Sequence, residues 1–152
     1  MAAVTFSHRH LVILALGAAF ACGGRHANVA PAPSAPAETV DQFLAAVNAN
    51  DLDRMASLWG DARGPSNVVN AFPVTERNKR LTIMQRLLQS DAHQVVGTDV
   101  GNPEQTRLSV LITVGTRRFA VPFTMVQSRY GGWLVKEIGL DAAMPTAGGR
   151  SN

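Results

Sequence analysis

Hydrophobic positions between residues 38 and 59 recur with the period of an α-helix. The first apolar stripe consists of Val40, Phe43, Leu44 and Val47. Asn50-Asp51 then interrupts the pattern, and a second short amphipathic segment runs from Leu52 to Trp59. Asp51 is the expected N-cap of this second helix because its carboxylate can accept a free backbone N–H. Gly60 is its expected C-terminal stop.

A third helix is predicted after a loop that spans residues 64–73. Its apolar stripe consists of Leu81, Met84, Leu87 and Leu88. Thr75 is the expected N-cap, and the charged residues, Arg77 among them, are expected to lie mostly outside the stripe. The first half of the domain is therefore predicted to be helical.

From His93 onward the hydrophobic period changes to two, which is typical of strands. Four strands are predicted, over residues 93–100, 106–114, 117–127 and 133–140. Pro122 lacks a backbone N–H, so the third strand is expected to lie at an edge or to carry a bulge, and an edge could pair with a partner. Helices followed by antiparallel strands indicate an α+β fold with the helices packed on one face of the sheet.

The composition is that of a globular protein with a slight excess of positive charge. The chain has 152 residues, 46% of them hydrophobic, with 14 Lys and Arg against 11 Asp and Glu. Once a signal and a tether are set aside, roughly 100 to 115 residues remain, enough for one domain. The cations are spread along the chain without a basic patch interleaved with aromatics, so nucleic acid is not an expected partner.

The N-terminus predicts export. Arg9 precedes an apolar run over residues 11–20 that ends at small residues, which is the pattern of a cleavable signal covering residues 1–21. Ala19-Phe20-Ala21-Cys22 fits a signal peptidase I site and also resembles a bacterial lipobox, and both patterns place the cut before Cys22. The resemblance implies that Cys22 is lipidated and that the membrane is a partner through this lipid. The alternative is a soluble, secreted or periplasmic protein.

Cys22 is the only cysteine, so an internal disulfide and a multi-cysteine metal site are both excluded. Residues 22–37 contain several Ala and Pro and are expected to form an extended tether. The folded domain is expected over residues 38–142, and residues 143–152 are expected to be a disordered tail. The predicted location is therefore the cell envelope, with the domain held away from its anchor.

The opening of the domain resembles the nuclear transport factor 2-like superfamily, which includes SnoaL-like proteins and ketosteroid isomerase. The resemblance rests on residues 38–53, with an acidic break after the first helix, on Leu58-Trp59 in the second helix, and on Gly131-Gly132-Trp133 before the last strand. It implies a curved sheet folded around the helices as an open cone, with a pocket at its mouth. Many relatives dimerise through the sheet, so a homodimer is a further expectation.

Enzymes of this superfamily place a carboxylate base near a hydrogen-bond donor, because abstraction of a proton beside a carbonyl needs both. The weak catalytic candidates here are Glu137 and Asp99 as bases and Tyr130 as donor. Asp61 and His93 are further candidate bases, and the simplest interpretation places Asp61 in a turn and His93 at the surface. No pair among these residues has the spacing of a recognised motif.

Aromatic side chains are the remaining candidates for a binding site. The expected pocket-lining residues are Phe43, Trp59, Phe119, Phe123 and Trp133, although core packing is the simpler interpretation for each. No metal site or cofactor is expected. The leading hypothesis is an exported, lipid-anchored, non-catalytic binding or scaffold domain. The alternatives are a small-molecule enzyme of isomerase or cyclase type that uses a pocket carboxylate, and a carrier of small apolar ligands.

Overall fold

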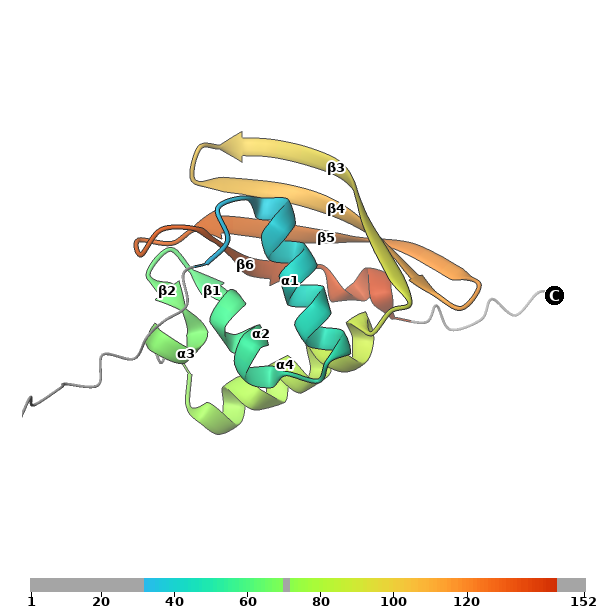
Figure 1. Ribbon diagram of the computed structural model, residues 1–152, viewed down its shortest axis with the longest axis horizontal. Coiled ribbons are helices and arrows are strands. Elements are labelled where there is room, and N and C mark those ends of the chain that lie inside the picture. Colours follow the sequence, from blue (N-terminus) through green and yellow to red (C-terminus); the bar gives the residue numbers. More distant parts are fainter. Residues whose placement is uncertain (1–31, 70–71, 145–152) are drawn as a thin grey trace, which may run out of the picture.

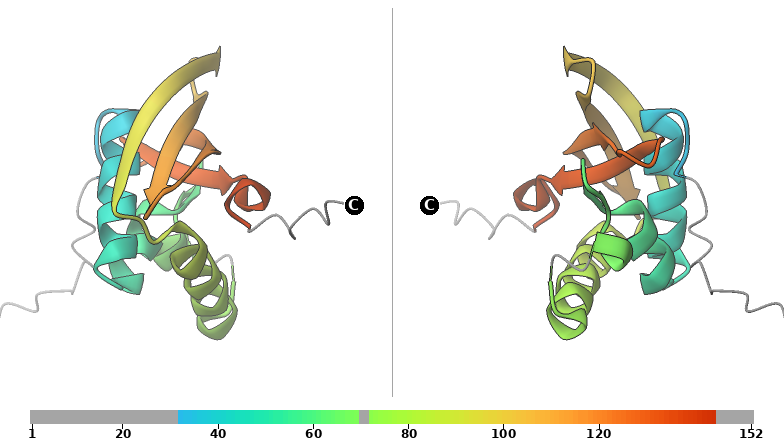
Figure 2. Two further views of the ribbon diagram at one scale, coloured as in Figure 1. Left: turned by 90° about the vertical axis from the view of Figure 1, so that its right-hand side faces the viewer. Right: turned by 90° about the vertical axis from the view of Figure 1, so that its left-hand side faces the viewer.

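The computed structural model describes residues 32–69 and 72–144 (Figure 1). Helices come first and are followed by a four-stranded antiparallel sheet, which confirms the predicted α+β fold. Figure 2 shows the helices gathered on one face of the curved sheet. The strands follow one another in the order β3-β4-β5-β6, and the sheet does not close because β3 and β6 do not pair.

The helices and strands are close to those predicted. The helices are α1 (Pro36–Asn48), α2 (Leu52–Leu58), α3 (Ser66–Val69) and α4 (Val74–Leu88), with a 3-10 turn, η1, at Leu140–Ala143. The main strands are β3 (Ala92–Asn102), β4 (Gln105–Val114), β5 (Arg117–Gln127) and β6 (Trp133–Ile138). A small hairpin of β1 (Gly60–Asp61) and β2 (Gly64–Pro65) lies where the sequence predicted a helix stop and a loop.

The helix ends show which capping predictions hold. Asp51 caps α2 as predicted, because its carboxylate accepts a hydrogen bond from the backbone N–H of Arg54 at 2.8 Å. Gly60 is not the stop of α2, which ends at Leu58 because Trp59 turns to an extended conformation and leads into β1. Thr75 is not a cap either. The α4 helix begins at Val74 after Pro73, and no side chain caps it.

Most apolar stripe residues point into one core between the helices and the concave face of the sheet. The largest fully buried side chains include Phe43, Leu44, Leu81, Leu108, Ile112 and Phe123. Arg77 departs from the prediction, since only 8% of it is exposed. Its Nη1 lies 3.5 Å from the carbonyl oxygen of Ser66, so this cation sits between α4 and α3 rather than on the outside of α4.

Pro122 does not mark an edge, because β5 lies between β4 and β6. Its carbonyl oxygen accepts a hydrogen bond from the N–H of Gly139, just after β6, at 2.9 Å. In an antiparallel sheet the N and O of one residue point toward the same neighbouring strand, so the nitrogen of Pro122 also faces β6 and not β4. The pairing of β5 with β6 stops at Phe123 and Ile138, one residue earlier. Pro122 therefore removes no ladder bond. The bulge of this ladder lies instead at Lys136 of β6.

The described fold extends beyond the predicted limits of residues 38 and 142. The first helix begins at Pro36, and Pro33 is already buried against the domain. At the other end Ala143 belongs to η1 and is buried in the core. Residues 1–31, which include the predicted signal, Cys22 and most of the predicted tether, lie outside the described residues.

Candidate functional site

The two carboxylates proposed as bases lie on the outer face of the sheet, far from each other. Asp99 of β3 is opposite Arg107 of β4, Arg107 is opposite Thr124 of β5, and Thr124 is opposite Glu137 of β6. Residues directly opposite one another share a face of the sheet. Asp99 and Glu137 are thus three strand spacings apart, on the order of 14 Å. They do not form one site.

Tyr130 does not face either carboxylate as a donor. Its hydroxyl accepts a hydrogen bond from Nη2 of Arg129 at 2.9 Å, and the guanidinium of Arg129 also lies 4.9 Å from the ring centroid. The ring packs against Gly64, where an added Cβ would lie 2.7 Å from a ring carbon. Within the described residues no hydrogen bond joins Tyr130 to a carboxylate side chain, and the residue is 59% exposed.

The other two candidate bases are paired with partners. Oδ2 of Asp61 accepts a hydrogen bond from Nη2 of Arg63 at 2.7 Å, within the turn between β1 and β2. This hydrogen bond is the main reason why the pKa of Asp61 lies below its ordinary value. A lowered pKa makes a carboxylate a weaker base. His93 pairs with Asp41 of α1, at 3.0 Å between Nε2 and Oδ1.

The five aromatic candidates do not line one pocket. Phe43 and Phe123 are fully buried and pack edge to face with their centroids 6.5 Å apart, so they are core residues. Phe119 is half-buried beneath the guanidinium of Arg117. Trp133 is half-buried against the core. Trp59 borders a recess.

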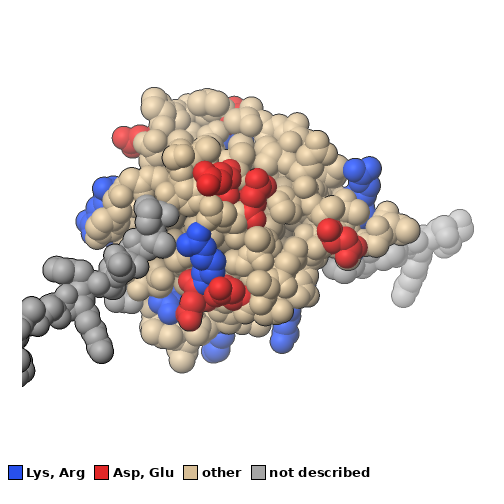
Figure 3. Space-filling view, in the orientation of Figure 1, with Lys and Arg blue, Asp and Glu red and all other residues tan. Residues whose placement is uncertain are grey.

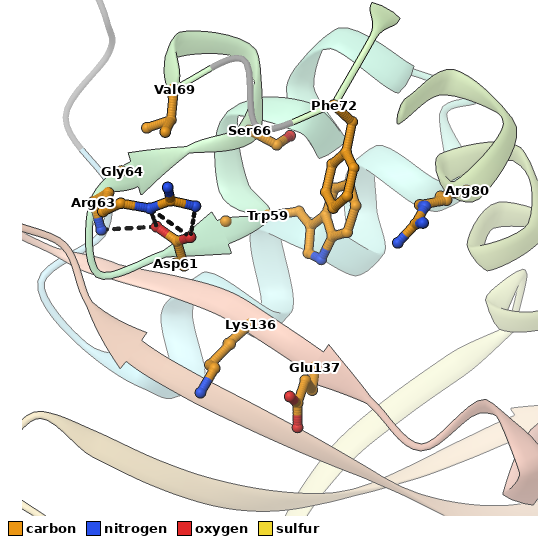
Figure 4. Close-up of a pocket in the computed structure, with 11 residues that line it drawn as sticks. Trp59, Asp61, Arg63, Gly64, Ser66, Val69, Phe72, Arg80, Lys136 and Glu137 are labelled. Atoms are coloured by element: carbon orange, nitrogen blue, oxygen red, sulfur yellow. Dashed lines mark hydrogen bonds and ion pairs between the residues drawn. The ribbon is translucent and has the colours of Figure 1, made fainter. Parts of the chain in front are cut away.

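This recess lies beside the β1–β2 hairpin and has a volume of about 260 Å³ (Figure 4). Its walls come from the hairpin, the start of α3, Phe72, Arg80 of α4 and the bulge of β6. The β1 strand runs along the edge of β6, where Trp59 makes a parallel bridge to Val135. The hairpin thereby forms a wall at the edge of the main sheet.

An aromatic stack lies in the recess. The rings of Trp59 and Phe72 are almost parallel, with an interplanar angle of 5° and 5.9 Å between centroids. The guanidinium carbon of Arg80 lies 4.3 Å from the centroid of Phe72, a cation–π distance. Nε of Arg80 also donates to Glu76 one turn earlier, at 3.1 Å. Arg80 is therefore held by both a ring and a carboxylate.

The bulge of β6 brings two further charges to the recess. Val135 pairs with Met125 and Glu137 pairs with Thr124, so Lys136 is the extra residue between them. Both Lys136 and Glu137 border the recess (Figure 4). Neither makes an ion pair within residues 32–69 and 72–144. A second, more open recess of about 390 Å³ shares Asp61, Arg63 and Lys136 with the first.

The sequence predicted only part of this arrangement. Asp61 and Arg63 stand two apart between glycines, and this spacing is a sequence signal for a turn stabilised by side chains. Phe72 and Arg80 gave no such signal, because the first lies in a predicted loop and the second on the polar face of a helix. The position of Lys136 at the recess depends on the bulge in β6, and the hydrophobic pattern of a strand does not predict a bulge.

Other kinds of site find no support in the described part of the chain. No group of three or more His, Cys, Asp or Glu in it is arranged to hold a metal ion. None of its helices is both long and apolar enough to cross a membrane. On the face seen in Figure 3, acidic and basic side chains are interspersed.

The recess is thus the candidate site taken forward: a stacked aromatic pair bordered by charged groups that include Asp61 and Glu137, whereas Asp99 lies elsewhere on the sheet. Comparison of the chain with protein-family models and with curated proteins gives no match.

Proposed function

We propose that this protein is an exported, lipid-anchored binding domain of the nuclear transport factor 2-like class. It holds a small ligand in the recess beside the β1–β2 hairpin and performs no chemistry on it. The observation that carries the proposal is the juxtaposition of the stacked Trp59 and Phe72 rings with charged groups in one recess. Ligand sites typically combine apolar and aromatic walls with a few placed polar groups.

The pairing and exposure of the two carboxylates that border the recess, Asp61 and Glu137, favour a binding role over catalysis. Asp61 is neutralised by Arg63, and Glu137 is exposed at the rim. A general base of the isomerase type needs a raised pKa and a nearby donor for the enolate. The pKa of Asp61 is shifted in the opposite direction. Of the two carboxylates that border the recess, Asp61 is therefore poorly suited to act as the base of the isomerase or cyclase alternative.

The size of the recess favours a small ligand over a lipid-like cargo. Ligand pockets usually measure about 300 to 1,000 Å³. At about 260 Å³ the recess lies below that range, so it fits a single ring better than a fused-ring or long-chain molecule. This observation weighs against the alternative of an apolar-ligand carrier.

The binding proposal is tested by nuclear magnetic resonance on protein purified after expression of the whole chain. The chain has two tryptophans and hence two indole N–H signals, which Trp59→Phe assigns. Ring-sized compounds that bind in the recess are expected to shift the Trp59 signal and leave that of Trp133 in place. A panel of such compounds that leaves the Trp59 signal unmoved at millimolar concentration contradicts the proposal.

Export and anchoring are supported by the sequence alone, through the signal pattern and Cys22. Intact-mass spectrometry of the mature protein should show a chain that starts at Cys22 and carries added lipid mass. Cys22→Ala should lose this mass and leave the membrane fraction. A wild-type chain that starts at Cys22 without lipid would establish plain secretion instead.

We also propose that two copies associate through the outer face of the sheet. This face carries uncharged side chains in neighbouring positions of β4 and β5, namely Ser109, Leu111, Ala120 and Pro122. The helices pack on the opposite face (Figure 2), so none of the described helices covers these residues. Light scattering should give the mass of a dimer, and Ala120→Arg should return a monomer. A monomeric wild type contradicts this arrangement.

A further inference from the structure

The wall shared by the two recesses carries two cations, Arg63 and Lys136, and one carboxylate, Asp61. Asp61 faces two cations, because Arg63 binds it directly and the charge of Lys136 also lowers its pKa. One carboxylate neutralises one of these cations. The other, Lys136, makes no ion pair within residues 32–69 and 72–144 and can meet a negative group that enters the recess.

The hydrogen-bond donors of this wall are also only partly used. Nε and Nη2 of Arg63 both donate hydrogen bonds to Oδ2 of Asp61, at 3.0 and 2.7 Å. Its Nη1 and the ammonium of Lys136 make no hydrogen bond within residues 32–69 and 72–144. A guanidinium offers five N–H donors and an ammonium offers three. The free donors suit an acceptor that carries negative charge.

Trp59 and Phe72, which also border the recess, indicate what apolar group a ligand could carry. Trp59 is 7% exposed and stacks on the half-buried Phe72, so the apolar wall of the recess is aromatic. Arg80 holds Phe72 through its ring. Aromatic rings prefer to meet in offset or edge-to-face contact, and the geometry therefore suits another single ring.

We infer that the recess selects small aromatic carboxylates, with the ring against Trp59 and Phe72 and the carboxylate on Lys136 and Arg63, all of which border it. This inference rests on the proposed binding function and adds its ligand class. The volume of about 260 Å³ accommodates a ring with one substituent. Glu137 at the rim opposes such a ligand, because its negative charge lies on the residue next to Lys136.

Two ligands and two matched variants test the inference. Benzoate and benzyl alcohol share a ring and differ in charge, and their affinities are measured from the shift of the Trp59 indole signal. Benzoate is expected to bind about tenfold more tightly, the effect of one charge-assisted hydrogen bond at a partly exposed site. Lys136→Met should remove this preference. Glu137→Gln, the neighbouring charge change, should instead strengthen benzoate binding by about twofold to threefold, since it removes a repulsion.

The outcomes separate the ligand class from the binding function. Equal affinities for benzoate and benzyl alcohol, unchanged in Lys136→Met, would overturn the aromatic carboxylate and leave the recess as a site for neutral rings. If neither compound moves the Trp59 signal at millimolar concentration, the binding proposal for this recess fails together with the inference. The unfolding temperatures of both variants, which change only partly exposed side chains, should stay near that of the wild type.

Discussion

The backbone N–H of Trp133 donates a hydrogen bond to the carbonyl oxygen of Pro33, at 2.8 Å. The chain segment before α1 is thereby fastened to the edge of β6. Thr39 strengthens this junction, since its hydroxyl lies 3.2 Å from the carbonyl oxygen of Trp133. The last residues of the predicted tether therefore belong to the folded domain.

Gly132 should be indispensable to this junction. Its φ is +75°, and an added Cβ would collide with the backbone of Ala32. Gly132→Ala is expected to destabilise the protein by the left-handed backbone cost of about 1–2 kcal/mol plus the cost of displacing that segment. Gly131→Ala is the matched control, because Gly131 has a φ of +84° and open space around its Cβ position. Equal losses in urea denaturation would show that the contact with Ala32 contributes nothing.

The cap of α2 should be measurable by a single substitution. Asp51→Ala removes the acceptor of the Arg54 N–H and is expected to cost about 1 kcal/mol of unfolding free energy. Asp53→Ala changes another acidic residue of the same first turn without removing a cap and should cost less. Chemical denaturation of the two variants checks this order, and a reversed order would contradict the role of Asp51.

Phe43 should behave as a core residue and not as part of a ligand site. It is fully buried against Phe123, so Phe43→Ala is expected to cost about 3–5 kcal/mol through lost burial and a cavity. Phe119→Ala is expected to cost less, because Phe119 is half-buried. Thermal unfolding gives both values. A small loss for Phe43→Ala would mean that this part of the core is loosely packed.

The pairing of Asp61 with Arg63 should appear in the acid titration. The hydrogen bond from Arg63 lowers the pKa of Asp61, so Arg63→Gln is expected to raise this pKa toward its ordinary value. Because the folded-state pKa is the lower one, the pair stabilises the protein above the unfolded-state pKa, and this contribution is lost as the pH falls below about 4. Carboxyl chemical shifts between pH 2 and 6 measure the change. Arg129→Gln, which removes a neighbouring cation without a bond to Asp61, should leave the titration of Asp61 unchanged.

The local pattern of the sequence determined most of the secondary structure. Periods of 3.6 and 2 predicted the main helices and strands, and the third predicted strand matches β5 from Arg117 to Gln127. The cap at Asp51 was equally readable, because a cap depends on residues only three positions apart. The α+β fold followed from the order of these segments.

Tertiary structure alone decided which residues meet. Lys136 reaches the recess through a bulge, Phe72 reaches it by stacking on Trp59, and Asp99 and Glu137 are separated because they lie on the first and last strands of the sheet. Pro122 is tolerated inside the sheet because β6 ends beside it. Each of these outcomes depends on contacts between segments far apart along the chain, and hydrophobic periodicity carries no information about such contacts.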